Sequence, residues 1–254
     1  MTGKELRRAR LFREDGRSVV VALDHAQFSG ALSGLTPMRA IVQQVVDGKG
    51  DAVILNPGAV RDCAPVIAGR CGLILRITGA STEKNPTFDF HRQICSVEHA
   101  SAIGADAVIA MGFIGGTGEA QSLVLLSKIA EQCNRLGMPL VAEMLPSDPE
   151  HFTDPGWIGL AARTACELGA DVVKAYTTGE SADADIISGC SVPFLAAGGP
   201  KSENPREIAM RAMEHGAAGI AFGRNVFGSA DPCQIVKDLV QEIHGEAAKG
   251  GFAK

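Results

Sequence analysis

Lys174 is the residue whose surroundings most clearly indicate chemistry. It interrupts the run DVVKAY at 171–176, which is otherwise apolar or aromatic after its first aspartate. Burying a lysine is costly unless it is paired or reactive, and burial lowers the pKa of an amine from about 10.4 toward the range in which it attacks a carbonyl carbon. A neighbouring cation such as Arg76 would act in the same direction. We therefore predict a nucleophilic lysine; the alternative is a structural lysine paired with Asp24 or Glu143.

Other polar side chains stand at the carboxyl ends of short apolar runs, where parallel α/β sheets and barrels place their active sites. In chain order they are Asp24, His25, Arg76, Thr78, Glu143 and Tyr176. Side chains two residues apart in a strand share a face, so Glu143 is expected on the face of Leu145, and Lys174 on the face of Tyr176. The sequence therefore predicts one site built from several strand ends.

Two glycine-rich turns are candidates for a phosphate site. They are Ala197-Gly198-Gly199-Pro200-Lys201 and Gly223-Arg224-Asn225, and each follows a predicted strand. Backbone N–H groups in such turns bind phosphate, and Arg224 would add a charged contact; the alternative is that the glycines only make tight turns. A third glycine cluster at 112–118 matches neither the dinucleotide-binding nor the P-loop pattern, so we expect a mobile or substrate-facing loop there and no cofactor.

These residues need a scaffold of alternating strands and helices. Mostly continuous apolar runs predict buried parallel strands at 18–24, 52–55, 73–77, 107–111, 139–144, 171–176, 192–196 and 218–222. Helical spacing predicts helices at 37–48, 87–103, 118–136, 156–168, 203–215 and 231–244. A glycine recurs just before the strands at 50–54, 104–109, 169–173 and 216–220, which indicates left-handed helix caps and tight turns. The pattern predicts an α/β fold, a single (β/α)8 TIM barrel over 1–254 with a short N-terminal helix.

Composition and charge exclude other classes of protein. With 46% hydrophobic and 21% charged residues, the chain is predicted to be soluble and globular, and no apolar run is long enough to cross a membrane. The formal net charge of -5 argues against nucleic acid as a partner. Glu5, Glu14 and Asp15 interrupt the arginine-rich N-terminus, which favours a surface helix over an organelle presequence.

The cysteines and histidines predict neither a disulfide framework nor a metal site. The seven cysteines are scattered and never spaced as C-x-x-C, as expected for reduced, mostly buried thiols of a cytoplasmic protein. Asp24 and His25 could ligate a metal together, but no third ligand is evident. We expect metal-independent chemistry, with surface or helix positions for most of the other histidines, His91, His99, His151, His215 and His244.

With these residues in place, the chain resembles the DhnA/DeoC-like class I aldolases. The nearer relatives are the archaeal-type fructose-bisphosphate aldolases, the 2-amino-3,7-dideoxyheptulosonate synthases and the autoinducer-2 phosphate thiolase. The resemblance runs from VALDHA through DAVILNPG, GADAVI and DVVKAY to AAGGPK and IAFGRNVF. It implies that Lys174 forms the Schiff base and that Asp24 assists proton transfer. It also implies a phosphate site at Gly198, Gly199, Gly223 and Arg224.

The chain departs from the family at one position. Many members carry a Tyr-Pro pair at the end of strand 5, with the tyrosine as general acid/base, whereas this chain has Leu145-Pro146. A leucine cannot transfer a proton. Glu143, at a position that is often aromatic in the relatives, is the preferred substitute, and Tyr176, the only tyrosine of the chain, is the second candidate.

The resulting expectation is a carbon–carbon lyase that acts on a phosphorylated ketose or keto compound, with dihydroxyacetone phosphate as one possible product or substrate. His25 and Arg76 are predicted to bind the substrate. The alternatives are a transferase of the transaldolase or thiolase type with the same imine chemistry, and a non-catalytic sugar-phosphate-binding protein. The resemblance also implies a homo-oligomer, in this family often a decamer, and apolar helix faces such as 37–48 would allow it.

Overall fold

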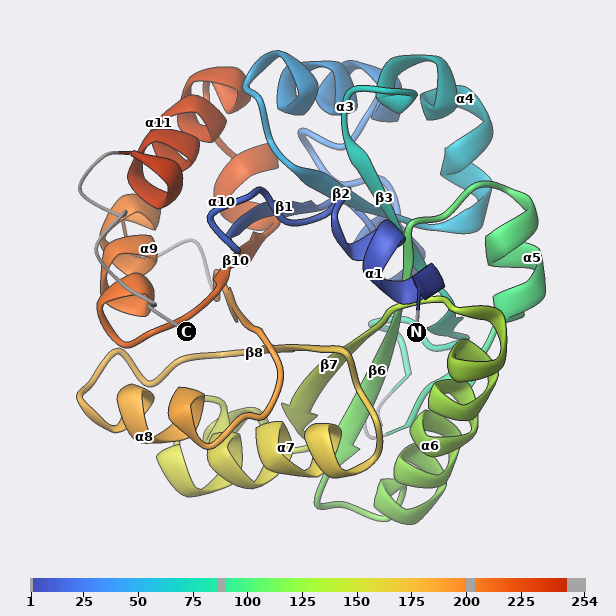
Figure 1. Ribbon diagram of the computed structural model, residues 1–254, viewed down its shortest axis with the longest axis vertical. Coiled ribbons are helices and arrows are strands. Elements are labelled where there is room, and N and C mark those ends of the chain that lie inside the picture. The colour runs from blue at the N-terminus through green and yellow to red at the C-terminus, as the bar shows by residue number, and fades with distance from the viewer. Residues whose placement is uncertain (1, 86–89, 200–203, 246–254) are drawn as a thin grey trace.

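The continuously apolar runs form the strands of a closed parallel barrel (Figure 1). The structure is a computed structural model that describes residues 2–85, 90–199 and 204–245. The barrel order follows the chain, and the last strand pairs with the first. The strands are β1 (Ser18–Ala22), β2 (Ala52–Leu55), β3 (Gly72–Arg76), β6 (Ala107–Ile114), β7 (Leu140–Pro146), β8 (Val172–Ala175), β9 (Phe194–Ala197) and β10 (Gly219–Phe222). The predicted TIM-barrel fold is confirmed.

Helices surround the barrel and cover its outer face (Figure 1). They are α2 (Ala26–Ser29), α3 (Met38–Asp47), α4 (Pro57–Ile67), α5 (Val97–Ala102), α6 (Glu119–Leu136), α7 (Pro155–Glu167), α8 (Ala182–Ser188), α9 (Pro205–Glu214), α10 (Arg224–Phe227) and α11 (Pro232–His244), with a 3-10 turn at Pro149–His151. Several begin with a proline after a capping side chain: Asp154 accepts a hydrogen bond from the N–H of Trp157 (3.1 Å), and Asp231 from that of Gln234 (2.9 Å). None of these helices is long and apolar enough to span a membrane.

The glycines at three predicted joints have the expected left-handed backbone. Their φ angles are 88° at Gly104, 94° at Gly169 and 95° at Gly216. At the joint before β2 the left-handed residue is Lys49 (φ 68°), one position before the glycine that was expected to take that conformation.

Three local predictions were wrong. The helix expected at 87–103 is only α5, because Arg92–Gln93 forms β5, which pairs with β4 (Thr78–Gly79) in a small antiparallel ribbon; residues 86–89 lie outside the described part. Gly112 lies within β6 and not in a loop, and a Cβ there would stand 2.6 Å from the Met144 sulfur, so this glycine packs closely against that side chain. The apolar face of 37–48 is buried against the barrel and its neighbouring helices and is not available for subunit contacts.

The N-terminal segment closes one end of the barrel. After α1 (Thr2–Arg8), Leu11 enters the barrel interior, where it is 1% exposed and packs among the inward residues of the strands. Basic residues of this segment pair with the aspartates of the helix-to-strand joints, namely Lys4 with Asp171 (2.6 Å), Arg10 with Asp106 (2.9 Å) and Arg13 with Asp51 (2.5 Å). The predicted N-terminal helix is therefore confirmed, and its charges serve to seal the amino-terminal end of the barrel.

Candidate active site

The barrel interior changes from apolar to charged along its length. The layers nearer the amino-terminal end of the barrel consist of aliphatic side chains such as Val20, Ile74 and Val172. Two residues further along the strands, the inward positions carry Arg76 and Lys174, each at most 5% exposed. The charged layer lies at the carboxyl end of the barrel, where the active sites of this fold occur.

Arg76 is the centre of the charged layer. Its Nε donates to the Oδ2 of Asp24 (2.7 Å), and its Nη2 forms an ion pair with Glu143. Its third nitrogen, Nη1, is buried and has no hydrogen-bond partner in the described part of the chain. Since buried donors normally have partners, this N–H group is available to a substrate oxygen.

Lys174 forms an ion pair with Glu143, its register neighbour on β7. The alternative reading of the sequence, a lysine paired with Glu143, thus describes part of its environment. Burial of Glu143 would raise the pKa of its carboxyl, but the charges and hydrogen bonds of Lys174 and Arg76 hold that pKa well below its usual range. Glu143 is therefore ionised, and its negative charge faces the amine that it contacts.

Asp24 and His25 lie beside this group, as predicted. The carboxylate of Asp24 is 3.6 Å from His25 Nδ1, and its backbone oxygen accepts a hydrogen bond from Asn56 (2.7 Å). Burial lowers the pKa of His25, with Asp24 acting in the opposite direction. The Oδ1 atom of Asn56 is buried with no hydrogen-bond partner in the described residues. Asn56 is therefore a further polar group at the carboxyl end of the barrel, one that the sequence did not reveal.

Tyr176 stands two residues beyond Lys174 and packs against Phe152, with ring centroids 5.1 Å apart. Burial raises the pKa of its phenol, and the nearby positive charge of Arg224 acts in the opposite direction. Leu145 is buried in the same small cluster. The structure thus brings Tyr176 to Arg224, on the side of the predicted phosphate turns, while Glu143 contacts Lys174 directly.

The two phosphate-turn candidates lie next to each other. Asn225 donates from Nδ2 to the backbone oxygen of Gly198 (2.8 Å), which ties the turn after β9 to α10. A Cβ on Gly223 would lie 2.4 Å from the His25 ring, so only glycine fits there. At Gly199 (φ 61°) a Cβ would meet nothing within 4 Å, so open space adjoins this backbone. Pro200 and Lys201 lie outside the described residues.

The family model for DeoC/LacD family aldolases matches residues 18–229. The chain belongs to this family. The family resemblance and the predicted class of enzyme, an aldolase, are confirmed.

Two curated relatives of this aldolase are synthases. This chain is 33% identical over 254 residues to the 2-amino-4,5-dihydroxy-6-oxo-7-(phosphonooxy)heptanoate synthase of Streptomyces griseus. The match covers 97% of this chain and 92% of the relative. It is 35% identical over 248 residues to the 2-amino-3,7-dideoxy-D-threo-hept-6-ulosonate synthase 1 of Archaeoglobus fulgidus, covering 96% and 92%.

A solved structure matches the aldolase along its whole length. It is an archaeal fructose-1,6-bisphosphate aldolase whose catalytic lysine is covalently bound to the carbinolamine intermediate of its substrate. The TM-score is 0.86 at 27% identity, over 96% of this chain and 100% of the other.

His91 is an exception to the expectation that most of these histidines lie on the surface or in helices. It is 1% exposed and its ring lies between those of Phe28 and Phe113, each with a centroid distance of 5.2 Å. Burial, and secondarily the charge of Arg76, lower its pKa to about 4. The imidazole is therefore neutral near neutral pH and lines the charged layer without adding to its charge. In the described residues, no group of three or more His, Cys, Asp or Glu side chains is placed to hold a metal ion.

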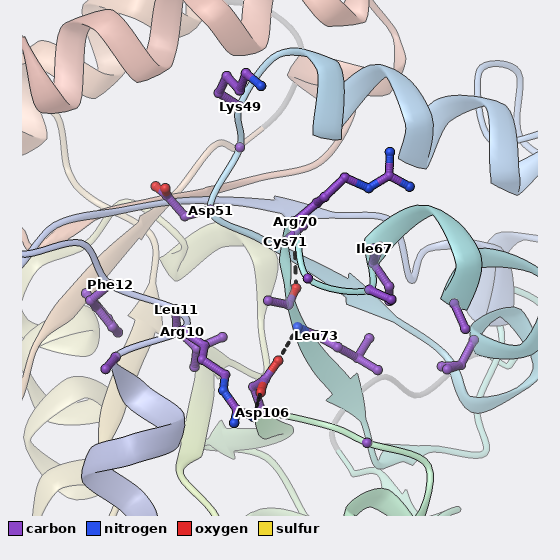
Figure 2. Close-up of a pocket in the computed structure, with 18 of the residues that line it drawn as sticks. Arg10, Leu11, Phe12, Lys49, Asp51, Ile67, Arg70, Cys71, Leu73 and Asp106 are labelled. Carbon is purple, nitrogen blue, oxygen red and sulfur yellow. Dashed lines mark hydrogen bonds and ion pairs between the residues drawn. The ribbon is translucent and has the colours of Figure 1, made fainter.

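A hollow lies at the opposite, amino-terminal end of the aldolase barrel. It has a volume of about 870 Å³, and Figure 2 shows Asp106 in it, between Arg10 and the backbone of Leu73. Its lining comes from the N-terminal segment and the joints before β2, β3 and β6. None of the predicted site residues lines it, so this hollow is separate from the charged layer.

Proposed function

We propose that Lys174 is the amine with which this aldolase forms a Schiff base on a phosphorylated ketose or keto compound. The observation that carries the proposal is the buried contact between Lys174 and the ionised Glu143 at the carboxyl end of β8. In this proposal the carboxylate takes up the proton that the amine must lose before it attacks a carbonyl carbon.

The expected reaction has three stages. The Lys174 amine adds to the substrate carbonyl, and water leaves as the carbinolamine becomes an iminium ion. A base then removes the proton of the hydroxyl group on the far side of the scissile bond, the C–C bond breaks, and its electrons enter the iminium as an enamine. The enamine takes up a proton and water releases the product from the lysine; synthesis runs the same steps in reverse.

We assign the proton transfers at the imine to Glu143. It contacts Lys174 directly, whereas Tyr176 packs against Phe152 and lies near the charge of Arg224. The negative charge of Glu143 also stabilises the iminium ion, because the iminium nitrogen carries a positive charge where the lysine ammonium carried one before. Asp24, which is fixed by Arg76, is assigned to a substrate hydroxyl, and the free Nη1 of Arg76 is assigned to a substrate oxygen.

The phosphate group of the substrate is assigned to Gly198, Gly199, Gly223 and Arg224. The support is the open space at Gly199, the absence of room for any side chain at Gly223, and the positive charge of Arg224, the next residue in the chain. Tyr176 then orients Arg224 toward the phosphate.

A second candidate is the synthetic direction, in which the enamine attacks an acceptor aldehyde. The observation that favours it is that the two curated relatives at 33% and 35% identity are both synthases. Transfer to another acceptor, such as coenzyme A, uses the same imine. Product analysis with the ketone phosphate alone, with an aldehyde and with coenzyme A separates the three.

Borohydride trapping tests the proposal. Dihydroxyacetone phosphate and a panel of longer ketose phosphates are each incubated with the enzyme and reduced with borohydride, and the adduct is located by peptide mass spectrometry. We expect one adduct, on Lys174, and none in Lys174→Met. Ligand-induced thermal stabilisation without an adduct or turnover would instead identify a sugar-phosphate-binding protein.

We further propose that the enzyme works in the cytoplasm as a homo-oligomer. Large apolar side chains remain exposed on the barrel exterior, among them Val124 on α6 (53% exposed) and Leu160 on α7 (57% exposed). Light scattering coupled to size exclusion tests this; a monomer at micromolar concentration would contradict it.

A further inference from the structure

A small apolar cluster lies at the mouth of the barrel, beside the charged layer. It consists of Met111 and Phe113 on β6 and Leu145 on β7, with Phe152 and Tyr176 packed against it. It is separate from the aliphatic layers nearer the amino-terminal end, so it does not continue the core that fills the barrel. We call these five residues the mouth cluster.

Strand geometry turns the mouth cluster toward the barrel axis. On β7, Val141 belongs to the interior aliphatic layer, and Glu143 and Leu145 follow it on the same face. Leu145 in turn is the register neighbour of Phe113 on β6. The mouth cluster therefore forms the next layer of the interior beyond Glu143, at the end of the barrel where ligands of this fold bind.

The mouth cluster borders the reacting amine. Glu143 contacts Lys174 and is the register neighbour of Met111. Leu145 stands two residues beyond Glu143 on the same strand. Met111 and Leu145 are 7% and 6% exposed, much as Glu143 (8%) and Lys174 (5%) are. A ligand that reaches Lys174 therefore reaches this apolar wall as well.

The side of the mouth formed by β1, β2 and β3 is polar instead. Asp24, Asn56 and Arg76 stand at the ends of these strands, which are neighbours in the barrel. The Oδ1 of Asn56 and the Nη1 of Arg76 are buried without a hydrogen-bond partner among the residues that the structure describes. The mouth cluster has one hydroxyl, that of Tyr176, and it lies near the charge of Arg224. Hydroxyl groups of a substrate therefore find partners on the polar side and not at the mouth cluster.

The strand order sets the direction in which a substrate lies. The turns assigned to the phosphate follow β9 and β10, Lys174 is on β8, and the mouth cluster is mainly on β7 and β6; these strands are neighbours in this order (Figure 1). A substrate with its phosphate at those turns and its carbonyl at Lys174 therefore extends its far end toward the mouth cluster.

We propose that the mouth cluster is a specificity-determining subsite that takes a hydrocarbon end of the substrate. The proposal rests on the proposed function, because it uses the positions assigned there to the phosphate and the carbonyl. The substrate class is then a keto phosphate whose chain carries hydroxyl groups near the scissile bond and is alkyl or aryl beyond it. A methylene group is stabilised by leaving water against this wall, whereas a hydroxyl loses its hydrogen bonds to water without a replacement.

Two unreactive phosphate esters test the subsite. They are mannitol 1-phosphate and its 5,6-dideoxy analogue, which share their carbon chain and the hydroxyl groups at C2 to C4 and differ only at the far end. Neither has a carbonyl group, so neither forms an imine, and titration calorimetry on the wild-type enzyme measures binding alone. We expect the Kd of the dideoxy analogue to be lower by about tenfold or more. It should fall by about threefold to fourfold again for each of the next two methylene groups added to the chain.

Substitutions in the mouth cluster connect this preference to its side chains. Leu145→Asn places an amide of similar size in the wall, so the preference for the dideoxy analogue should fall by about tenfold. Leu145→Met keeps the wall apolar and is the matched control, with the preference of the wild type. If circular dichroism shows that Leu145→Asn does not fold, Phe152→Asn at the half-buried edge of the cluster gives the same comparison.

The outcomes separate the subsite from the aldol chemistry. Equal or tighter binding of mannitol 1-phosphate, binding of neither ester, or a preference that the polar substitutions leave unchanged would overturn the subsite. Borohydride trapping with dihydroxyacetone phosphate, which has no far end to place, tests Lys174 independently. An adduct on Lys174 together with any of those three results would remove the subsite and keep the proposed function. The expected Kd ratios without an adduct would do the reverse.

Discussion

The two ends of the barrel use the same kind of ion pair for different purposes. At the amino-terminal end, Asp51, Asp106 and Asp171 each face a basic residue of the N-terminal segment and also accept a backbone N–H of the adjacent strand, at 2.6, 3.0 and 2.8 Å. At the carboxyl end, Arg76 and Lys174 face two carboxylates, and one arginine nitrogen is left without a partner in the described residues. The first arrangement completes the hydrogen bonding of the fold, whereas the second keeps capacity for a ligand.

Burial accounts for the difference in energy. The Arg10 side chain is 67% exposed, and an ion pair in water contributes at most about 1 kcal/mol. The Arg76 side chain is 1% exposed, and removing one partner of a buried ion pair costs about 3–5 kcal/mol because the remaining charge is left uncompensated.

The two lysines should differ most. Lys174→Met removes the proposed nucleophile and is expected to lower kcat/KM by about 10⁴-fold or more, equivalent to at least about 5 kcal/mol of transition-state stabilisation. Lys4→Met breaks the ion pair with Asp171 at the other end and should leave kcat/KM within about twofold. Steady-state kinetics on the substrate found by trapping measure both. An active Lys174→Met enzyme would remove the basis of the proposed function.

The two arginines should differ in stability. Arg76→Met leaves Asp24 buried without its cation and is expected to lower the free energy of unfolding by about 3–5 kcal/mol. Arg10→Met should lower it by less than about 1 kcal/mol. Urea unfolding followed by circular dichroism measures both. Equal losses of unfolding free energy in the two variants would contradict the contrast, because the exposed and the buried ion pair would then contribute equally to stability.

Substitutions of Glu143 and Tyr176 should have different kinetic effects. Glu143→Gln keeps the shape of the side chain but cannot accept the proton of Lys174, so kcat should fall by about 10²–10³-fold. Tyr176→Phe keeps the contact with Phe152 and loses only the hydroxyl group near Arg224, so its main effect should be a higher KM. A large fall of kcat in Tyr176→Phe alone would move the acid/base role to the tyrosine.

The site residues on the strands were predictable because strand geometry is simple. Alternation along β7 and β8 places Glu143 and Lys174 on the inner face, and barrel closure then brings them together whatever the details of the loops. The strand runs were recognisable because they are continuously apolar up to these charges. The role of each residue in the reaction remains a prediction.

The residues that were missed depend on contacts that local patterns do not encode. His91 enters the site because the two-residue strands β4 and β5 pair, and such short strands show no periodicity. The helix-to-strand joints were recognised by their glycines, but the role of Asp106 was not, since its partner Arg10 lies 96 residues away in sequence. Asn56 was missed for a similar reason: it contacts the backbone of Asp24, 32 residues earlier.

The last prediction concerns the histidines of the two ends. His244 lies between Asp15 (2.7 Å) and Asp51 (2.9 Å) at the amino-terminal end, whereas His91 lies between two aromatic rings at the carboxyl end. The pKa of His91 is lowered to about 4, so the unfolded chain takes up this proton near its ordinary value of 6.5, before the folded protein does. The stabilisation is therefore complete above that value and is lost as the pH falls toward 4.

Between pH 7 and pH 5 this loss amounts to about 2 kcal/mol for His91 alone. The free energy of unfolding should therefore fall less steeply with decreasing pH in His91→Gln than in the wild type, by about that amount over this interval. Exposed His99 on α5 provides the matched control, and His99→Gln should follow the wild type. Urea unfolding at both pH values measures the difference. If His91→Gln kept the full pH dependence, the imidazole would be protonated within the site, and the charged layer would contain a third cation beside Arg76 and Lys174.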